Sequence, residues 1–570
     1  MKKFNFIFAI VMKTKQLLAT MATLLIVGTA FPQDTGFFRI YERDDKEFRS
    51  CRGVVELDDG SFVVAANDTI VIITYTDYGD TIITHRFDLD AEGELIKVSA
   101  EGELLGSVPV SEADGYCKIL NIFPHPSVHG LFVGLGFVTL ADGFFNCWPP
   151  EWYGHLCLFH FDGDLNITER INPNWPDGLQ TPKVCDYSVN NSMIRADGSI
   201  FSVPVFYQTS NNERHRFFTL FSPEGDIERI VEDNTVPDQP CVETVFEATD
   251  RSLWFVRDVQ WHPYQDSHTL FRLDKNMQAE AVNEFHDFAY DSVLYYNNET
   301  GQWVMDKYHI SLPNRIRAAF PMDDSTLLFS TVCDEHFYRS TSDTNLFVTD
   351  RSTVLFKTDI EGNILQHRVL GSLNDTVEET PFYPTALSHD GPAGQNHVYH
   401  CHSTEHESHL EYPNHLVVTK LTEDLDIVWS KKYERTNTFL KPFYVTATSD
   451  GGCIVVGYAK RDVQVYPPSY GHNEIFVLKL LPDGTVGSGE ITVCDEMAVY
   501  PNPAKNEVRL LPPPDKKPAQ IELYDLQGRL VRSQGSGLET LSLQGLAPGQ
   551  YVMKVTMADG TTFTDKVVKE

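Results

Sequence analysis

Apolar and polar residues alternate along much of this chain in short stretches that Asp and Gly residues interrupt. The pattern is clearest between 444 and 486, where apolar runs flank first Asp450-Gly451-Gly452 and then Asp483-Gly484. A period of two predicts β-strands, and Asp-Gly and Gly-Gly sequences allow the positive φ angles of tight hairpins. The segment from 444 to 486 therefore predicts four antiparallel strands joined by turns.

Six earlier segments repeat this arrangement in a degenerate form. Each combines turn sequences with apolar strand runs, and together they cover 58–95, 131–165, 195–227, 248–277, 322–364 and 388–429. Four antiparallel strands per repeat are one blade of a β-propeller, and closure of the ring removes exposed sheet edges. The sequence thus predicts an all-β protein with a seven-bladed β-propeller from 36 to 490. An eight-bladed ring is the alternative, with Tyr290 to Tyr308 as a stray hairpin.

The residues from 495 to 570 form a separate pattern. Short alternating runs, divided by turn residues, lie at 508–510, 521–523, 551–555 and 562–567. Pro501 and Pro503 cannot donate the hydrogen bonds of a sheet ladder, which places them at the leading edge of this part. Several short strands in about 75 residues predict a small Ig-like β-sandwich after the propeller.

The sequence blocks of this tail follow one another in a distinctive order. They contain, in chain order, Tyr500, Pro501, Asn502, Pro503, Gly528, Gly549, Lys566 and Lys569. In this order they closely resemble the type A C-terminal sorting domain of type IX secretion, found in the Bacteroidota. The resemblance implies that the type IX secretion machinery is a partner of the tail, and that the protein is carried across the outer membrane. It also implies that the tail is cleaved off, near residues 487–495.

The N-terminal residues 1–30 have the pattern of a signal peptide. A basic stretch after Met12 precedes an apolar run at 17–27 and a small-residue cleavage site at 28–30. The apolar run is short for a membrane span, so no transmembrane segment is expected. A second basic start at Met1 leaves open which methionine begins the protein. The expected localisation follows: export through the periplasm, then secretion or attachment to the outer-membrane surface.

The charge balance excludes some partners. Lys and Arg number 46 while Asp and Glu number 80, which gives a formal net charge of −34. The tail from 495 has ten acidic and nine basic residues, so the central region carries nearly all of this charge. Such a surface repels nucleic acid phosphates and anionic lipids, and it suits neutral glycans, cationic peptides or divalent cations. Solubility alone accounts for the charge equally well.

The chain has ten cysteines, which fits an exported protein that can form disulfides. It has no Cys-x-x-Cys sequence, so zinc-ribbon and thioredoxin-like sites are not expected. Cys147 and Cys157 flank a nine-residue loop and predict a disulfide that closes it, unless Cys157 lies inside a strand. Cys453 lies in an apolar run and is expected in the core.

Two sequence patterns come close to metal sites. The first begins at Asp88 like a calcium loop, but its twelfth position is Ser99 where a Glu is needed. The second is a group of six histidines in 397–415, in which His400 and His402 on one strand would share a face and form a possible metal pair. The complete His-Glu-x-x-His sequence is missing from it. We therefore expect no metal, no cofactor and no catalytic residue.

The loop-rich region from 144 to 178 carries many aromatic and proline residues. Trp148, Trp152 and Tyr153 lie in it, and aromatic faces in loops are good platforms for sugars or peptides. Alternatively, these rings fill the space between blades. The sequence holds no phosphate loop, nucleophile elbow or Rossmann glycine pattern. The expected function is binding of an extracellular glycan, peptide or protein; the alternative is a polysaccharide hydrolase or lyase acting from the propeller funnel.

Overall fold

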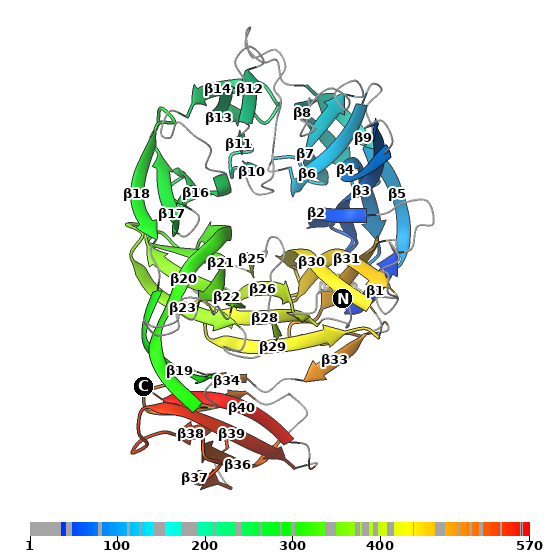
Figure 1. Cartoon of the computed structure of the whole chain (residues 1–570). Helices are drawn as coiled ribbons and strands as arrows, with labels where there is room; N and C mark the ends of the chain where they lie inside the picture. Colours follow the sequence, from blue (N-terminus) through cyan, green and yellow to red (C-terminus); the bar gives the residue numbers. More distant parts are fainter. Residues whose placement is uncertain are drawn as a thin grey trace, which may run out of the picture.

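The computed structural model consists of β-strands (Figure 1). It describes residues 36–569 apart from 42–47, 78–81, 111–114, 126, 141–153, 173–191, 204, 209–212, 234–241, 263–264, 286–287, 298–301, 337–348, 371–376, 379–386, 391–396, 407–414, 437, 462–472, 488, 490, 496–497, 501–503, 512–516, 536–537, 559 and 561. No helix in this described part is long and apolar enough to cross a membrane. The expectation of an all-β protein is confirmed.

The central region is a ring of antiparallel sheets that follow one another in chain order (Figure 1). In the first and second sheets each strand pairs with the next strand along the chain, as expected when short turns join antiparallel strands. The first sheet contains β2 (Phe48–Glu56), β3 (Phe62–Asp77), β4 (Ile82–Val98) and β5 (Leu104–Val110). The second contains β6 (Gly115–Pro124), β7 (Leu131–Leu140), β8 (Gly154–Asp162) and β9 (Ile167–Ile171).

The third and fourth sheets keep the same order. In the third sheet, β11 and β12 both pair with β13 and share one strand position. Its strands are β10 (Ser192–Ile194), β11 (Ile200–Ser202), β12 (Val205–Gln208), β13 (Glu213–Phe221) and β14 (Ile227–Glu232). The fourth sheet contains β15 (Val242–Glu247), β16 (Leu253–His262), β17 (Gln265–Leu273) and β18 (Ala279–Phe285).

The fifth and sixth sheets each have one additional strand. The fifth contains β19 (Phe288–Asn297), β20 (Gln302–Pro321), β21 (Thr326–His336), β22 (Thr349–Asp359) and β23 (Ile364–Leu370). Tyr290 pairs with Tyr308 between β19 and β20, so the hairpin expected there extends this sheet. The sixth contains β25 (Leu387–Asp390), β26 (His397–Ser403), β28 (Leu416–Thr422), β29 (Ile427–Glu434) and β33 (Thr492–Asp495). A small pair consists of β24 (Val377–Glu378), which precedes the sixth sheet in sequence, and β27 (Glu405–His406), which lies between β26 and β28.

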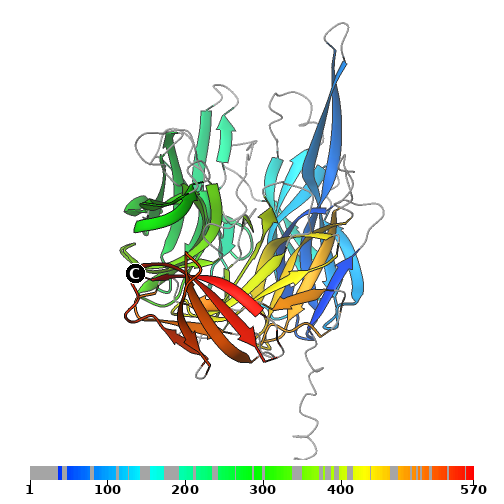
Figure 2. The ribbon, with the colours of Figure 1, turned by 60° about the horizontal axis from the view of Figure 1, so that its bottom comes forward.

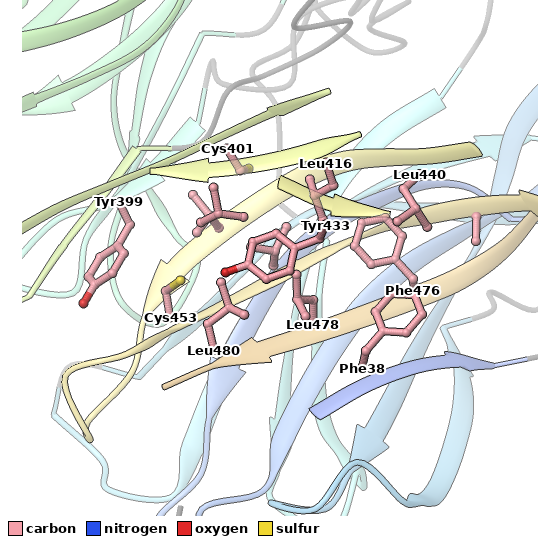
Figure 3. Packing of buried hydrophobic residues seen from close by; sticks show 14 of the residues in the cluster. Phe38, Tyr399, Cys401, Leu416, Tyr433, Leu440, Cys453, Phe476, Leu478 and Leu480 are labelled. Atoms are coloured by element: carbon pink, nitrogen blue, oxygen red, sulfur yellow. The ribbon is translucent and has the colours of Figure 1, made fainter. Parts of the chain in front are cut away.

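The seventh sheet joins the two ends of the central region. It contains β30 (Thr438–Ala447), β31 (Cys453–Arg461), β32 (Asn473–Leu480) and the first strand of the chain, β1 (Phe37–Tyr41). Phe37 and Phe38 are buried on opposite faces of β1. Phe37 packs with Phe62 of the first sheet, whereas Phe38 packs with Phe476 and with residues of the sixth sheet (Figure 3). The N-terminal strand therefore closes the ring.

The turns explain why the repeats are visible in the sequence. In the turn between β2 and β3, the amide of Ser61 donates a hydrogen bond of 2.9 Å to the Asp59 carboxylate, and Gly60 takes a φ of +78°. Burial alone would raise the pKa of Asp59, but the hydrogen bonds from Ser61 and the charge of Lys97 together lower it. The same bond from an amide to an Asp two residues earlier recurs at Asp197, Asp250, Asp323, Asp450 and Asp483.

The two ends of these sheets differ. In the described part of the chain, the tight turns that join first to second strands and third to fourth strands, such as those at 57–61 and 99–103, lie at one end of each sheet. The connections from second to third strand lie at the other end, where β7 and β8 are separated by 141–153 and β31 and β32 by 462–472. The β3–β4 hairpin also projects beyond the ring at this end (Figure 2). We call these the turn end and the loop end.

The tail consists of two further sheets next to the sixth sheet of the ring (Figure 1). One contains β34 (Ala498–Tyr500), β35 (Glu507–Leu511) and β38 (Thr540–Ser542). The other contains β36 (Pro518–Asp525), β37 (Leu530–Gln534), β39 (Gly549–Met557) and β40 (Thr562–Lys569). Both sheets contribute to one core, for example Val508 and Leu541 from the first and Leu523 and Met553 from the second. The strands expected from sequence in this tail are present.

Candidate functional site

The sorting-block residues lie at the two edges of the tail that the structure describes. Tyr500 ends β34 opposite Arg509, while residues 501–503 lie outside the described residues. Gly549 pairs with Lys569, and the amide of Ala504 donates a 2.8 Å hydrogen bond to the Val568 carbonyl. The first and last blocks are therefore neighbours in space. Lys566 belongs to β40, as Lys569 does, whereas Gly528 lies apart, in the exposed turn between β36 and β37 with a φ of +74°.

The aromatic residues proposed as a ligand platform, Trp148, Trp152 and Tyr153, lie outside the described residues. The strands on either side place their connection at the loop end, because β7 ends at Leu140 and β8 begins at Gly154. Cys147 of the expected disulfide also lies outside the described residues. Its partner Cys157 lies inside β8, where its Sγ is 3.6 Å from the Sγ of Cys117. Cys157 therefore lies inside a strand, which is the case in which the sequence does not predict the disulfide with Cys147.

The histidine pair, His400 and His402, lies on β26 in the middle of the sixth sheet. Side chains alternate along a strand, so these two share one face, and their ring centroids are 5.4 Å apart with an interplanar angle of 43°. Tyr399 and Cys401 point to the opposite face, where they pack with the seventh sheet (Figure 3). The same-face position expected from sequence is present.

The face that carries the histidine pair packs against the fifth sheet. Val398 of the same face forms one cluster with Leu328 and Leu355 of β21 and β22. Thr353 lies two residues from Leu355 on β22, toward the loop end. It therefore shares the face of Leu355, and it is fully buried. The histidine pair and Thr353 therefore share the seam between the fifth and sixth sheets.

Both imidazoles are removed from water. His400 is 0% exposed and His402 is 2% exposed. In the described part of the chain, neither ring nitrogen of either residue has a hydrogen-bond partner, and neither does the hydroxyl of Thr353. Burial and the neighbouring His402 hold the pKa of His400 well below its usual value, and burial and Lys432 lower the pKa of His402 to about 3. Both rings are therefore neutral at neutral pH.

The other histidines of this stretch do not join the pair in the described structure. His397 begins β26, His406 lies in β27, and the Nε2 atom of His415 lies 2.9 Å from the Glu434 carboxylate. Residue 409 lies outside the described residues. Within the described ranges, no three His, Cys, Asp or Glu side chains gather in a way that could hold a metal ion.

A second buried polar group lies in the seam between the third and fourth sheets, and the sequence pattern did not predict it. The Arg257 guanidinium on β16 is 0% exposed and pairs with the carboxylate of Asp233. Burial lowers the pKa of Arg257 to about 10, while the charge of Asp233 opposes that shift. The ring of Phe271 lies 5.0 Å from the Arg257 Cζ atom. The pair anchors the seam, and the only sequence signal was a basic residue in an apolar strand.

Comparison with solved structures gives distant likenesses. One is the β-propeller domain of the trilobed protease from Pyrococcus furiosus, at 9% identity and a TM-score of 0.37, covering 77% of this chain and 94% of that one. Another is hydrazine synthase from Kuenenia stuttgartiensis, at 12% identity and a TM-score of 0.37, covering 79% and 98%. A third is an α-L-arabinofuranosidase from Fusarium graminearum, at 9% identity and a TM-score of 0.32, covering 78% and 97%. These scores support no argument about function.

No curated protein sequence matches this chain. A family model does match its end: residues 498–570 match the secretion system C-terminal sorting domain. The match begins with β34 and covers both sheets of the tail. It confirms the resemblance that the block order predicted, so this chain carries a C-terminal sorting domain of type IX secretion.

Proposed function

We propose that this protein is an exported β-propeller binding protein, secreted or attached to the cell surface. In this proposal residues 1–30 are the signal peptide, 36–490 form a seven-bladed propeller, and 495–570 form a sorting sandwich of Ig-like type that engages the type IX secretion machinery. The observation that carries the proposal is the sorting domain at 498–570. The sheet order supports the propeller, because seven sheets follow around the described ring and β1 completes the last one.

The difference between the two ends of the ring supports binding at the loop end. Tight turns leave little surface for recognition, whereas long connections on a rigid scaffold are where binding proteins place their contacts. Trp148, Trp152 and Tyr153 belong to the connection between β7 and β8 at this end, and we propose them as ligand contacts. The formal charge of −34 disfavours anionic ligands and leaves a neutral glycan, a peptide or a protein as the ligand class.

A truncation tests the export half of the proposal. In a host with type IX secretion, the full chain should reach the surface or the medium, and a chain that ends at Asp495 should stay in the periplasm. The truncated chain keeps β33 and all sheets of the ring, so its fold can be checked by circular dichroism. As a matched control, residues 496–570 fused to an unrelated periplasmic protein should carry that protein to the surface. Surface delivery of the truncated chain would contradict the proposal.

A further inference from the structure

The histidine pair is unusual because the fold does not require it. In the fifth and seventh sheets, the strands equivalent to β26 are β21 and β31. Each of the three begins next to the end of the third strand of its sheet, beside the tight turn that follows that third strand. Counting from that turn, His400 corresponds to Phe329 in the fifth sheet and to Val455 in the seventh, and both are fully buried. Apolar residues thus occupy this position in neighbouring sheets. The packing of the core therefore does not explain why the sixth sheet has a histidine there.

The pair also brings a cost that a ligand would remove. A neutral imidazole carries one N–H donor and one acceptor nitrogen. The described structure leaves all four ring nitrogens of His400 and His402 without a partner, together with the Thr353 hydroxyl. Buried polar groups are nearly always paired, because a buried polar atom without a partner loses its hydrogen bonds to water and gains none. Five such atoms in one seam point to an absent binding partner of the rings.

The geometry of the pair fits a transition-metal ion. Zinc binds imidazole nitrogens at about 2.0–2.1 Å in a tetrahedral arrangement, which places the centres of two ligating rings roughly 5.2 Å apart. The ring centroids of His400 and His402 are 5.4 Å apart.

We propose that His400 and His402 bind one divalent transition-metal ion, zinc in the first instance, in the seam between the fifth and sixth sheets. Two imidazole nitrogens supply two ligands, and the Thr353 hydroxyl or water completes the coordination from the side of the fifth sheet. Lys432 is on the same face of the sixth sheet, since it pairs with Val417, which pairs with His402. Its positive charge opposes a bound cation and sets a limit on affinity. This inference is independent of export and of the ligand at the loop end.

The test measures zinc bound by the full chain after chelation, dialysis and reconstitution, by inductively coupled plasma mass spectrometry and by calorimetry. The double variant His400→Phe with His402→Thr carries the residues found at these positions in the fifth sheet, Phe329 and Thr331. The matched control is His415→Gln, which alters a partly exposed histidine of the same sheet whose Nε2 already contacts the Glu434 carboxylate. We expect about one zinc ion per chain for the unchanged protein and the control, and binding at least about tenfold weaker for the double variant.

Thermal unfolding separates a metal site from a purely structural pair. Zinc should raise the Tm of the unchanged protein and of His415→Gln, but not of the double variant. Without zinc, the double variant should be at least as stable as the unchanged protein, because it removes buried polar atoms that have no partner. Lys432→Gln should tighten zinc binding by removing a nearby positive charge.

Equal zinc content in the unchanged protein and the double variant would overturn the proposal. A Tm of the unchanged protein that does not respond to zinc or to chelation would also overturn it. If the double variant fails to fold, His402→Cys and His402→Ala replace it. The cysteine supplies another zinc ligand and should retain the ion, whereas the alanine should lose it; loss or retention in both would contradict the site.

Discussion

The closure of the ring by β1 gives a sharp prediction. Phe38→Ala removes a ring that is 2% exposed and that packs with Phe476 at a centroid distance of 6.2 Å. Replacing a buried Phe with Ala costs about 3–5 kcal/mol, because the lost burial is accompanied by a cavity. Phe37→Ala should cost a similar amount, since Phe37 is 0% exposed and packs on the other side of β1, against the first sheet.

The double variant should be far less stable than either single variant. The two rings contact different clusters but belong to one short strand, so their costs should add only in part, with the sum of about 6–10 kcal/mol as the upper limit. The whole free energy of unfolding of a domain is about 5–15 kcal/mol. The ring should therefore open at β1 in the double variant well before the other sheets unfold.

Urea unfolding and hydrogen exchange check this reasoning together. The single variants should shift the urea midpoint by the stated free energies, and β32, the partner of β1, should lose exchange protection first. Leu365→Ala is the control, because Leu365 is 56% exposed and such surface changes stay within about 0.5 kcal/mol. If Phe38→Ala costs no more than Leu365→Ala, or if exchange in β32 is unchanged, β1 does not close the ring.

Three further predictions concern buried charges and the loop end. Asp450→Asn should cost about 3 kcal/mol near neutral pH, because it breaks the buried ion pair with Lys479. Burial alone would raise the pKa of Asp450, but hydrogen bonds from Lys479 and Thr448 together lower it. The ion pair therefore stabilises the fold above about pH 4, and its contribution is lost as the pH falls through the lowered pKa of Asp450. Arg257→Ala should cost at most about 3–5 kcal/mol in urea unfolding, because it removes the nearer cation of the buried Asp233 carboxylate while Arg216 stays 3.9 Å from it. Replacing both tryptophans of the 141–153 connection with Ala should abolish binding on glycan and peptide arrays while leaving the Tm nearly unchanged.

Each of these has a clear contrary outcome. A cost of Asp450→Asn that stays the same from pH 7 down to pH 2 would remove the ion pair as its cause. A stability of Arg257→Ala equal to the unchanged protein would mean that the buried pair contributes nothing. A large loss of Tm in the double tryptophan variant would show that those rings fill the space between sheets.

Local features of the fold could be read from the sequence. Alternation and Asp-Gly pairs predicted strands and turns because both act within a few residues, as the Asp59–Ser61 turn shows. The sorting tail could be identified because its blocks follow one another at short range. The strand pair that closes the ring could not be predicted in this way. β1 pairs with β32, more than 400 residues later, and no local sequence pattern identifies β32 as the partner of β1.

The candidate site shows the same limit. The spacing of His400 and His402 placed both rings on one face, because side chains alternate along a strand. It did not show that this face is buried, or that no described group satisfies the rings, since both depend on the packing of the fifth sheet. The Arg257–Asp233 pair was missed for the same reason, because its partners come from different sheets. Local periodicity does not show which residues a segment distant in the sequence will bury.

In the proposed function, the tail exports the ring and is then cleaved off. Mass spectrometry of the protein recovered from the cell surface or medium tests it most directly. We expect a mature chain that ends near residues 487–495, a stretch that includes β33 of the sixth sheet, and no peptide from 521–529. Recovery of that peptide in full yield from exported protein would contradict the claim.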